Sequence, residues 1–209
     1  MKPTPSRLIL PSILSATLLL AGCSNSDAPQ AEVQQVPPSA DRPNVLYIMA
    51  DDLGFSDIGM FGGEISTPNL DQLASEGTRF TNFHTAIKCN PTRAMFHTGM
   101  DNNLGATGPR QNFQINPDTA TMPEILSAAG YQTFLAGKWD NGSDPGEWPS
   151  DRGYTRTWSM LGGAGTHWLN IEPDGSLDGE SEYAADGEKI LPPEDYYSSI
   201  TFTDKMIEF

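Results

Sequence analysis

The most informative part of the sequence is residues 89–99, which read Cys89-Asn90-Pro91-Thr92-Arg93-Ala94-Met95-Phe96-His97-Thr98-Gly99. Pro91 suits the first turn of a helix, where its missing N–H costs nothing. Cys89 is therefore expected just ahead of a helix N-terminus, where free backbone N–H groups and the helix dipole favour an anion. Arg93 lies one turn further on and points back toward the same spot. The alternative is an ordinary buried cysteine in a loop, the common environment of an unpaired thiol.

An apolar run at residues 44–50 precedes two adjacent carboxylates, Asp51 and Asp52. The run is bounded by Pro43 and Gly54, and its length predicts a buried strand of a parallel sheet. Open α/β sheets place their sites at the carboxyl ends of such strands. Two neighbouring carboxylates repel each other unless a cation lies between them, and their hard oxygen atoms suit calcium or magnesium. The alternative is a solvated turn.

The segment between these two motifs predicts framework. Thr67 followed by Pro68, with Gly77 after the end, indicates a short helix. The apolar residues of one helix face predict its buried stripe, which consists of Leu70, Leu73 and Ala74. Residues 79–83 alternate in the manner of a short strand.

A second helix–strand unit follows the cysteine segment. Thr121 and Glu124 form a capping-box pattern that predicts a helix ending at Gly130. Residues 131–136 predict the next strand, and Lys138 stands at its end, where an ordinary surface lysine is the alternative. The last predicted helix spans residues 198–209, with one face formed by Ile200, Thr203, Met206 and Ile207.

These motifs together resemble the sulfatase family, and in particular its bacterial cysteine-type arylsulfatases. The resemblance lies in a cysteine with proline two and arginine four residues on, the Asp51-Asp52 pair, and Gly137-Lys138-Trp139. It implies an α/β, alkaline-phosphatase-like fold with a mixed, mostly parallel sheet flanked by helices. It also implies sulfuric ester hydrolysis of a sulfate-ester substrate. A formylglycine-generating enzyme would oxidise Cys89 to formylglycine, whose hydrate attacks the sulfate ester.

The resemblance also assigns roles to individual residues. Asp51, Asp52 and residue 89 would bind one divalent cation, usually calcium, while Arg93 and Lys138 would contact the sulfate. Asp140 occupies the position where the family usually has a histidine, so it is the candidate for that catalytic role. A further negative charge beside a sulfate is unfavourable, which makes this position the main departure from the family. Two of the three histidines, His84 and His97, are interpreted as framework, and His167 as lining a pocket.

The resemblance covers residues 42–209, which match only the N-terminal part of the family's catalytic domain. A further histidine, a further lysine and an Asp-Asn pair of that domain have no match, and the chain stops inside a predicted helix. The sequence therefore predicts an incomplete, apparently truncated domain, inactive on aryl sulfates when taken alone. Two other functions stay open: a non-catalytic, sulfatase-like lipoprotein fragment, and a phosphonate or phosphate ester hydrolase that shares the cysteine signature.

Residues 1–41 predict export rather than fold. Lys2 and Arg7 precede a short apolar stretch, and residues 20–23 resemble the bacterial lipobox, so residues 1–22 are interpreted as a lipoprotein signal peptide. Cys23 would then be lipidated and would anchor the protein to a membrane. Ser24 after it favours the outer membrane, on its periplasmic or surface side. Residues 23–41 predict a flexible tether.

The composition excludes two further possibilities. The net charge of −15 argues against nucleic-acid binding. The 2 cysteines could form a disulfide in an exported protein, but each already matches a modification site, so no pairing is expected.

The lipobox interpretation predicts that Cys23→Ala abolishes lipidation. The unaltered protein should take up labelled palmitate and partition into detergent, because buried acyl methylenes favour a membrane. The variant should do neither. Equal labelling of the two proteins would contradict the interpretation.

Overall fold

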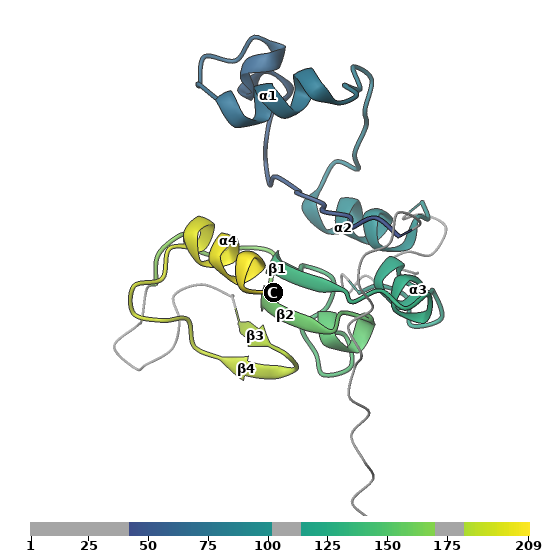
Figure 1. Cartoon of the computed structure of the whole chain (residues 1–209). Coiled ribbons are helices and arrows are strands. Elements are labelled where there is room, and N and C mark those ends of the chain that lie inside the picture. Colours follow the sequence, from purple (N-terminus) through teal and green to yellow (C-terminus); the bar gives the residue numbers. More distant parts are fainter. Residues whose placement is uncertain (1–41, 102–113, 170–181) are drawn as a thin grey trace, which may run out of the picture. The chain divides into compact units, whose positions relative to one another are not determined.

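The computed structural model describes residues 42–101, 114–169 and 182–209 (Figure 1). Its central element is a four-stranded sheet in the order β1-β2-β3-β4. The strands are β1 Phe134–Lys138, β2 Arg156–Met160, β3 Tyr183–Ala185 and β4 Glu188–Ile190. β1 and β2 are parallel, with Lys138 opposite Met160, whereas β2–β3 and β3–β4 are antiparallel. The predicted mixed sheet with flanking helices is confirmed.

The β3–β4 hairpin closes over two residues, Asp186 and Gly187, which both adopt left-handed backbone angles (φ 46° and 88°). Such angles fit a tight hairpin whose twist matches its strands, and aspartate and glycine are the residues that tolerate them. Asp186 also accepts hydrogen bonds from the Thr157 N–H and from Arg156 Nε, at 2.6 and 2.9 Å. The hairpin is thereby fixed to the start of β2.

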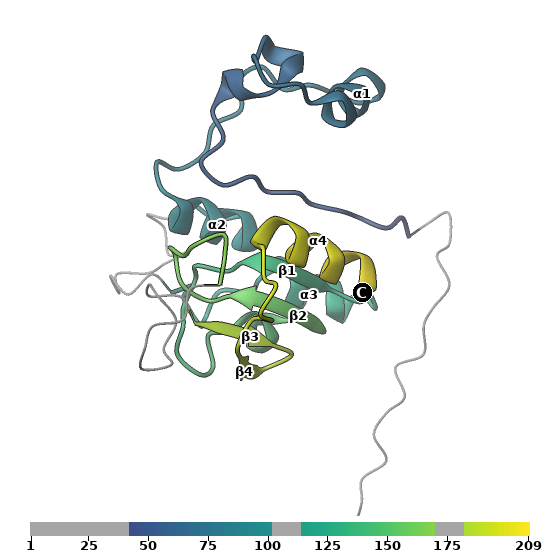
Figure 2. The same cartoon turned by 90° about the vertical axis from the view of Figure 1, so that its left-hand side faces the viewer.

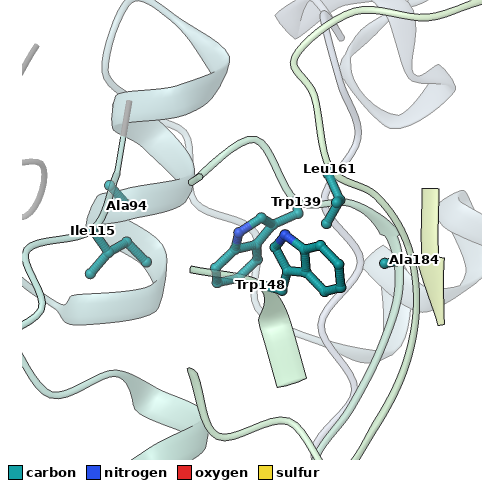
Figure 3. Close-up of a cluster of buried hydrophobic side chains, with 6 residues drawn as sticks. All are labelled: Ala94, Ile115, Trp139, Trp148, Leu161 and Ala184. Atoms are coloured by element: carbon teal, nitrogen blue, oxygen red, sulfur yellow. The ribbon is translucent and has the colours of Figure 1, made fainter. Parts of the chain in front are cut away.

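Side-chain alternation along β2 divides the core into two clusters, one on each face of the sheet. Trp158 and Met160 point to one face, where they pack with Tyr183 and Tyr196. Leu161, next along the chain, belongs to the other cluster, in which the indoles of Trp139 and Trp148 lie near each other (Figure 3). The remaining members of this second cluster are Ala94, Ile115 and Ala184.

The α-helices within the described ranges are α1 Pro68–Glu76, α2 Cys89–Thr98, α3 Met122–Ala128 and α4 Ser198–Glu208, with short 3₁₀ helices at Phe55–Asp57, Gly59–Phe61 and Pro149–Arg152. The predicted capping box of α3 is confirmed, because Glu124 N–H donates to Thr121 Oγ1 at 3.3 Å and Thr121 N–H donates to Glu124 Oε2 at 2.8 Å. α2 begins at Cys89 itself, one residue earlier than expected, and ends at Gly99 in the left-handed conformation.

α4 lies along the sheet near β1, on the face that carries Trp158 (Figure 2). The predicted apolar face of this helix is wrong. Phe202 and Phe209 pack against the Trp158 cluster, while Ile200 and Ile207 are 60% and 78% exposed. The side chains that pack are instead the two aromatic ones, because large rings bury more surface than aliphatic side chains.

Three further predictions are wrong for the described residues. Residues 43–50 form neither helix nor strand and are exposed, with Ile48 76% accessible, so the predicted buried strand is absent there. Residues 79–83 are also irregular, and the α1 stripe is not buried, since Leu73 is 63% exposed. The common reason is that an apolar pattern shows which residues can be buried, whereas burial itself needs a partner that the pattern does not supply.

None of the helices in the described ranges is long and apolar enough to cross a membrane. The predicted signal peptide, Cys23 and the tether lie outside the described residues.

The burial of His97 predicts a pH-dependent stability. His97 is 4% exposed and its ring lies 4.8 Å from that of Trp139. Burial, together with the charges of Arg93 and Arg152, lowers the pKa of His97 from 6.5 to about 3. Between these values the unfolded chain binds a proton that the folded chain does not, so the free energy of unfolding should fall by up to ~1.4 kcal/mol per pH unit as the pH drops.

Urea unfolding of the whole chain between pH 7 and 4 measures this slope. His97→Asn should flatten it relative to the unaltered protein. The control His84→Asn should leave it unchanged, because His84 is exposed and bonds only locally to Asn82. An unaltered slope in the His97 variant would show that another group controls the acid sensitivity.

Candidate active site at the carboxyl end of β1

One face of α2 docks on the end of β1 and sets the geometry of the site. The buried residues of the helix recur at helical spacing and are Asn90, Arg93, Ala94 and His97. Arg93 Nη1 donates to the Lys138 carbonyl at 2.7 Å, and Asn90 Nδ2 donates to the Asp140 carbonyl. The first turn of α2, which begins at Cys89, is therefore attached to the last residues of β1.

Four charged side chains meet at this junction. Lys138 Nζ lies 2.8 Å from Asp51 Oδ2 and 3.6 Å from Asp140 Oδ2. Arg93 Nη2 lies 3.7 Å from the same Asp51 oxygen. The Lys138 and Arg93 side chains are only 9% exposed, so these charges are largely removed from water and need one another as partners.

The environment moves the pKa values of these groups in different directions. Burial raises the pKa of Asp51, but the Lys138 ammonium and the Arg93 guanidinium outweigh it and hold the pKa below its usual value. Burial lowers the pKa of Lys138, and the contacts with Asp51, the Cys89 thiol and Asp140 more than reverse that effect. The pKa of Asp140 is raised, chiefly by burial, despite the opposing charges of Lys138 and Arg93. Lys138 therefore stays charged, while Asp140 holds its proton more tightly than an ordinary aspartate.

Asp51, Asp52 and Cys89 offer ligand atoms that all lie within 4.8 Å of one another, which is compatible with one metal ion. Two of the three donors are hard carboxylate oxygens, and the third is a soft thiol sulfur. A hard cation such as calcium prefers oxygen throughout, so this donor set fits it best when an oxygen replaces the sulfur of residue 89. The residues thus fit part of the shell of a hard divalent cation if an oxygen takes the place of the Cys89 sulfur.

Asp140 is held in an unusual conformation. Its backbone is left-handed (φ 53°), and its N–H continues the β1–β2 pairing by donating to the Leu161 carbonyl at 3.1 Å. Gly163 leaves room for the carboxylate, because a Cβ at that position would lie 2.6 Å from Asp140 Oδ1. Nothing in a local sequence pattern distinguishes Gly163, Asn90 and Asn141 from ordinary loop residues, so they were not predicted to belong to the site.

Of the three histidines, His97 is buried, whereas His84 and His167 are exposed. His97 packs on Trp139 and bonds through Nδ1 to the Tyr154 hydroxyl at 3.3 Å, as expected of a framework residue. His84 is exposed. His167 is also exposed, and its Nδ1 lies 2.6 Å from Ser198 Oγ at the start of α4.

Comparison with known proteins places this arrangement in context. Residues 43–209 match the family model described as Sulfatase. The chain is 36% identical to an arylsulfatase of Klebsiella aerogenes over 79% of its own length and 38% of the relative's. It is 35% identical to an N-acetylglucosamine-6-O-sulfatase of Bacteroides thetaiotaomicron, over 100% of this chain and 32% of that protein. The chain thus spans about a third of the length of these curated relatives.

Solved structures agree with these matches. A structure described as a complex with its substrate, D-glucosamine-2-N,6-O-disulfate, aligns with a TM-score of 0.64 and 30% identity. The alignment covers 80% of this chain and 31% of that one.

The donor set predicts opposite effects of two substitutions on calcium binding. Asp52→Asn should weaken binding about tenfold, because affinity follows the number of charged ligands. Lys138→Met should strengthen it, because the ammonium 2.8 Å from Asp51 Oδ2 competes with a cation for that oxygen. Isothermal titration of the full chain with calcium measures both. Asp204→Asn, at an exposed position of α4, is the control; a response of this control as large as that of Asp52→Asn would refute the site.

Proposed function

The chain belongs to the sulfatase family, and we propose that residues 42–209 contribute the N-terminal part of a sulfuric ester hydrolase site that cleaves a sulfate ester. The family generally uses formylglycine and a divalent metal. The observation that carries the proposal is the convergence of Cys89, Arg93 and Lys138 beside Asp51, since this set joins a modifiable nucleophile to two buried cations.

Formylglycine made from Cys89 would supply a hydroxyl nucleophile, and calcium held by Asp51, Asp52 and residue 89 would supply positive charge. Arg93 supports a sulfate-binding role because its guanidinium, with Nη2 3.7 Å from Asp51 Oδ2, brings a positive charge to the same place. Lys138 carries a permanent positive charge toward the same place, which would stabilise charge on the departing oxygen.

Asp140 would handle the proton. When the ester S–O bond breaks, the departing oxygen must take up a proton, and a carboxyl group with a raised pKa holds one at higher pH than usual. Its position 3.6 Å from Lys138 keeps it beside the same charged groups. Proton transfer by Asp140 would replace the family's histidine in this protein.

Two further features complete the proposal. A formylglycine-generating enzyme is the partner that would mature residue 89, because residues 89–93 present the cysteine, proline and arginine spacing of the family. Lipidation of Cys23 would place the mature protein at a membrane, on the periplasmic or surface side.

The first test is maturation. Co-production of the 209-residue chain with a formylglycine-generating enzyme should convert the –CH₂SH group of residue 89 to –CHO, detected by mass spectrometry and by reaction with a hydrazide. Cys89→Ala should give no product. Unmodified thiol alone, in a host that matures other cysteine-type sulfatases, would contradict the proposal.

The second test is anion binding, which does not require turnover. Lys138→Met should weaken binding of 4-nitrophenyl sulfate about tenfold, because a buried charge-assisted contact is lost. The same variant is expected to bind calcium more tightly, so a general loss of structure cannot produce both results. Lys205→Met removes a half-buried lysine paired with Glu208 and serves as the control. Equal affinity of Lys138→Met and the unaltered protein for 4-nitrophenyl sulfate would contradict the sulfate-binding role of Lys138.

A further inference from the structure

Asn141 and Asn90 form a buried pair that binds the main chain of Asp140. Asn141 is 1% exposed and Asn90 is 6% exposed. The side-chain amide of Asn141 donates to the Asp140 carbonyl at 2.6 Å and to the Asn90 carbonyl at 3.2 Å. Asn90 Nδ2 donates to the same Asp140 carbonyl. We call these three contacts the asparagine clamp.

The clamp lies just beyond Lys138, where the β1–β2 pairing ends on the carboxyl side of β1. Trp139 and Asp140 still donate their N–H groups to Met160 and Leu161, at 2.8 and 3.1 Å. The left-handed turn at Asp140 then takes its carbonyl out of the ladder. A buried carbonyl without a donor is costly, and the two amides satisfy it.

The orientation of the Asn141 amide is fixed by its partners. Both acceptors of Nδ2 are carbonyl oxygens, so the opposite orientation would set oxygen against oxygen. Its Oδ1 has no partner among the described residues. Asn141 is thus held through its two donated bonds alone, one to the strand end and one to the first turn of α2.

We propose that Asn141, through this clamp, is the positioning residue that holds Asp140 and Lys138 in register with Cys89. Asn90 directly follows Cys89, and Asn141 directly follows Asp140, so the clamp joins the neighbours of the two groups that must meet. Arg93 lies one helical turn after Asn90 on the same face of α2 and donates a hydrogen bond to the Lys138 carbonyl, which gives a second link between the two segments. The proposal rests on the proposed function for the role of these groups, but not for the existence of the clamp.

Asn141→Leu tests the clamp, since leucine has similar bulk and no donors. Hydrogen exchange of the full chain, followed by mass spectrometry, should show about tenfold faster exchange in peptides that cover residues 89–93 and 139–142. Peptides that cover α3 should not change. Thr133→Val is the matched control, because Thr133 is also buried and donates to the Gly153 carbonyl at 2.6 Å, next to the other end of β1. It should loosen its own surroundings and leave residues 89–93 protected.

Affinity for inorganic sulfate separates positioning from mere stability. Asn141→Leu should bind sulfate about tenfold more weakly, because Arg93 and Lys138 are no longer held together. Thr133→Val should bind it as the unaltered protein does. Unchanged exchange at residues 89–93, or equal sulfate affinity in both variants, would overturn the proposal. If the unaltered chain bound no sulfate, the proposed function would fail, while the exchange pattern would still decide whether the clamp holds the two segments together.

Discussion

The attachment of α2 to the end of β1 is the contact on which the site depends. A helix can rotate and slide over a sheet as long as only apolar groups touch, because the hydrophobic effect has no direction. Here side chains from the first turns of α2 donate hydrogen bonds to the carbonyls of residues 138 and 140. Ala94 and His97, further along the helix, pack against apolar side chains. The directional bonds fix the rotation of the helix, and the packing supplies the burial that keeps water out.

This attachment explains why charged groups are tolerated at the junction. Arg93 contributes to it with its main-chain bond and at the same time faces Asp51, while Lys138 lies between Asp51 and Asp140. Cations and carboxylates therefore alternate, and each buried charge has an opposite neighbour. The opposing pKa shifts of Asp51 and Asp140 follow from the same arrangement, since Asp51 receives more of the positive charge and Asp140 more of the desolvation.

Local signals in the sequence predicted the positions of the helices well. They could not show which surfaces pack against residues that are distant in the sequence. The capping box of α3 and the proline at the start of α1 depend on residues a few positions apart, which a sequence displays directly. The strand at 44–50 and the packed face of α4 depend on what lies opposite, and there the prediction was wrong. For the site, the rule that strand ends carry chemistry indicated Asp51 and Lys138. Asn141 escaped notice because an asparagine after a strand is usually solvated, and only the fold shows that this one is buried.

The clamp also bears on how this site can change over evolutionary time. Its bonds end on the carbonyl of residue 140 and not on the side chain. The placement of that backbone is therefore inherited separately from the identity of the side chain. Mutations at position 140 can exchange one side chain for another without first rebuilding the loop, which makes this a position where a lineage can vary side-chain chemistry on an unchanged backbone.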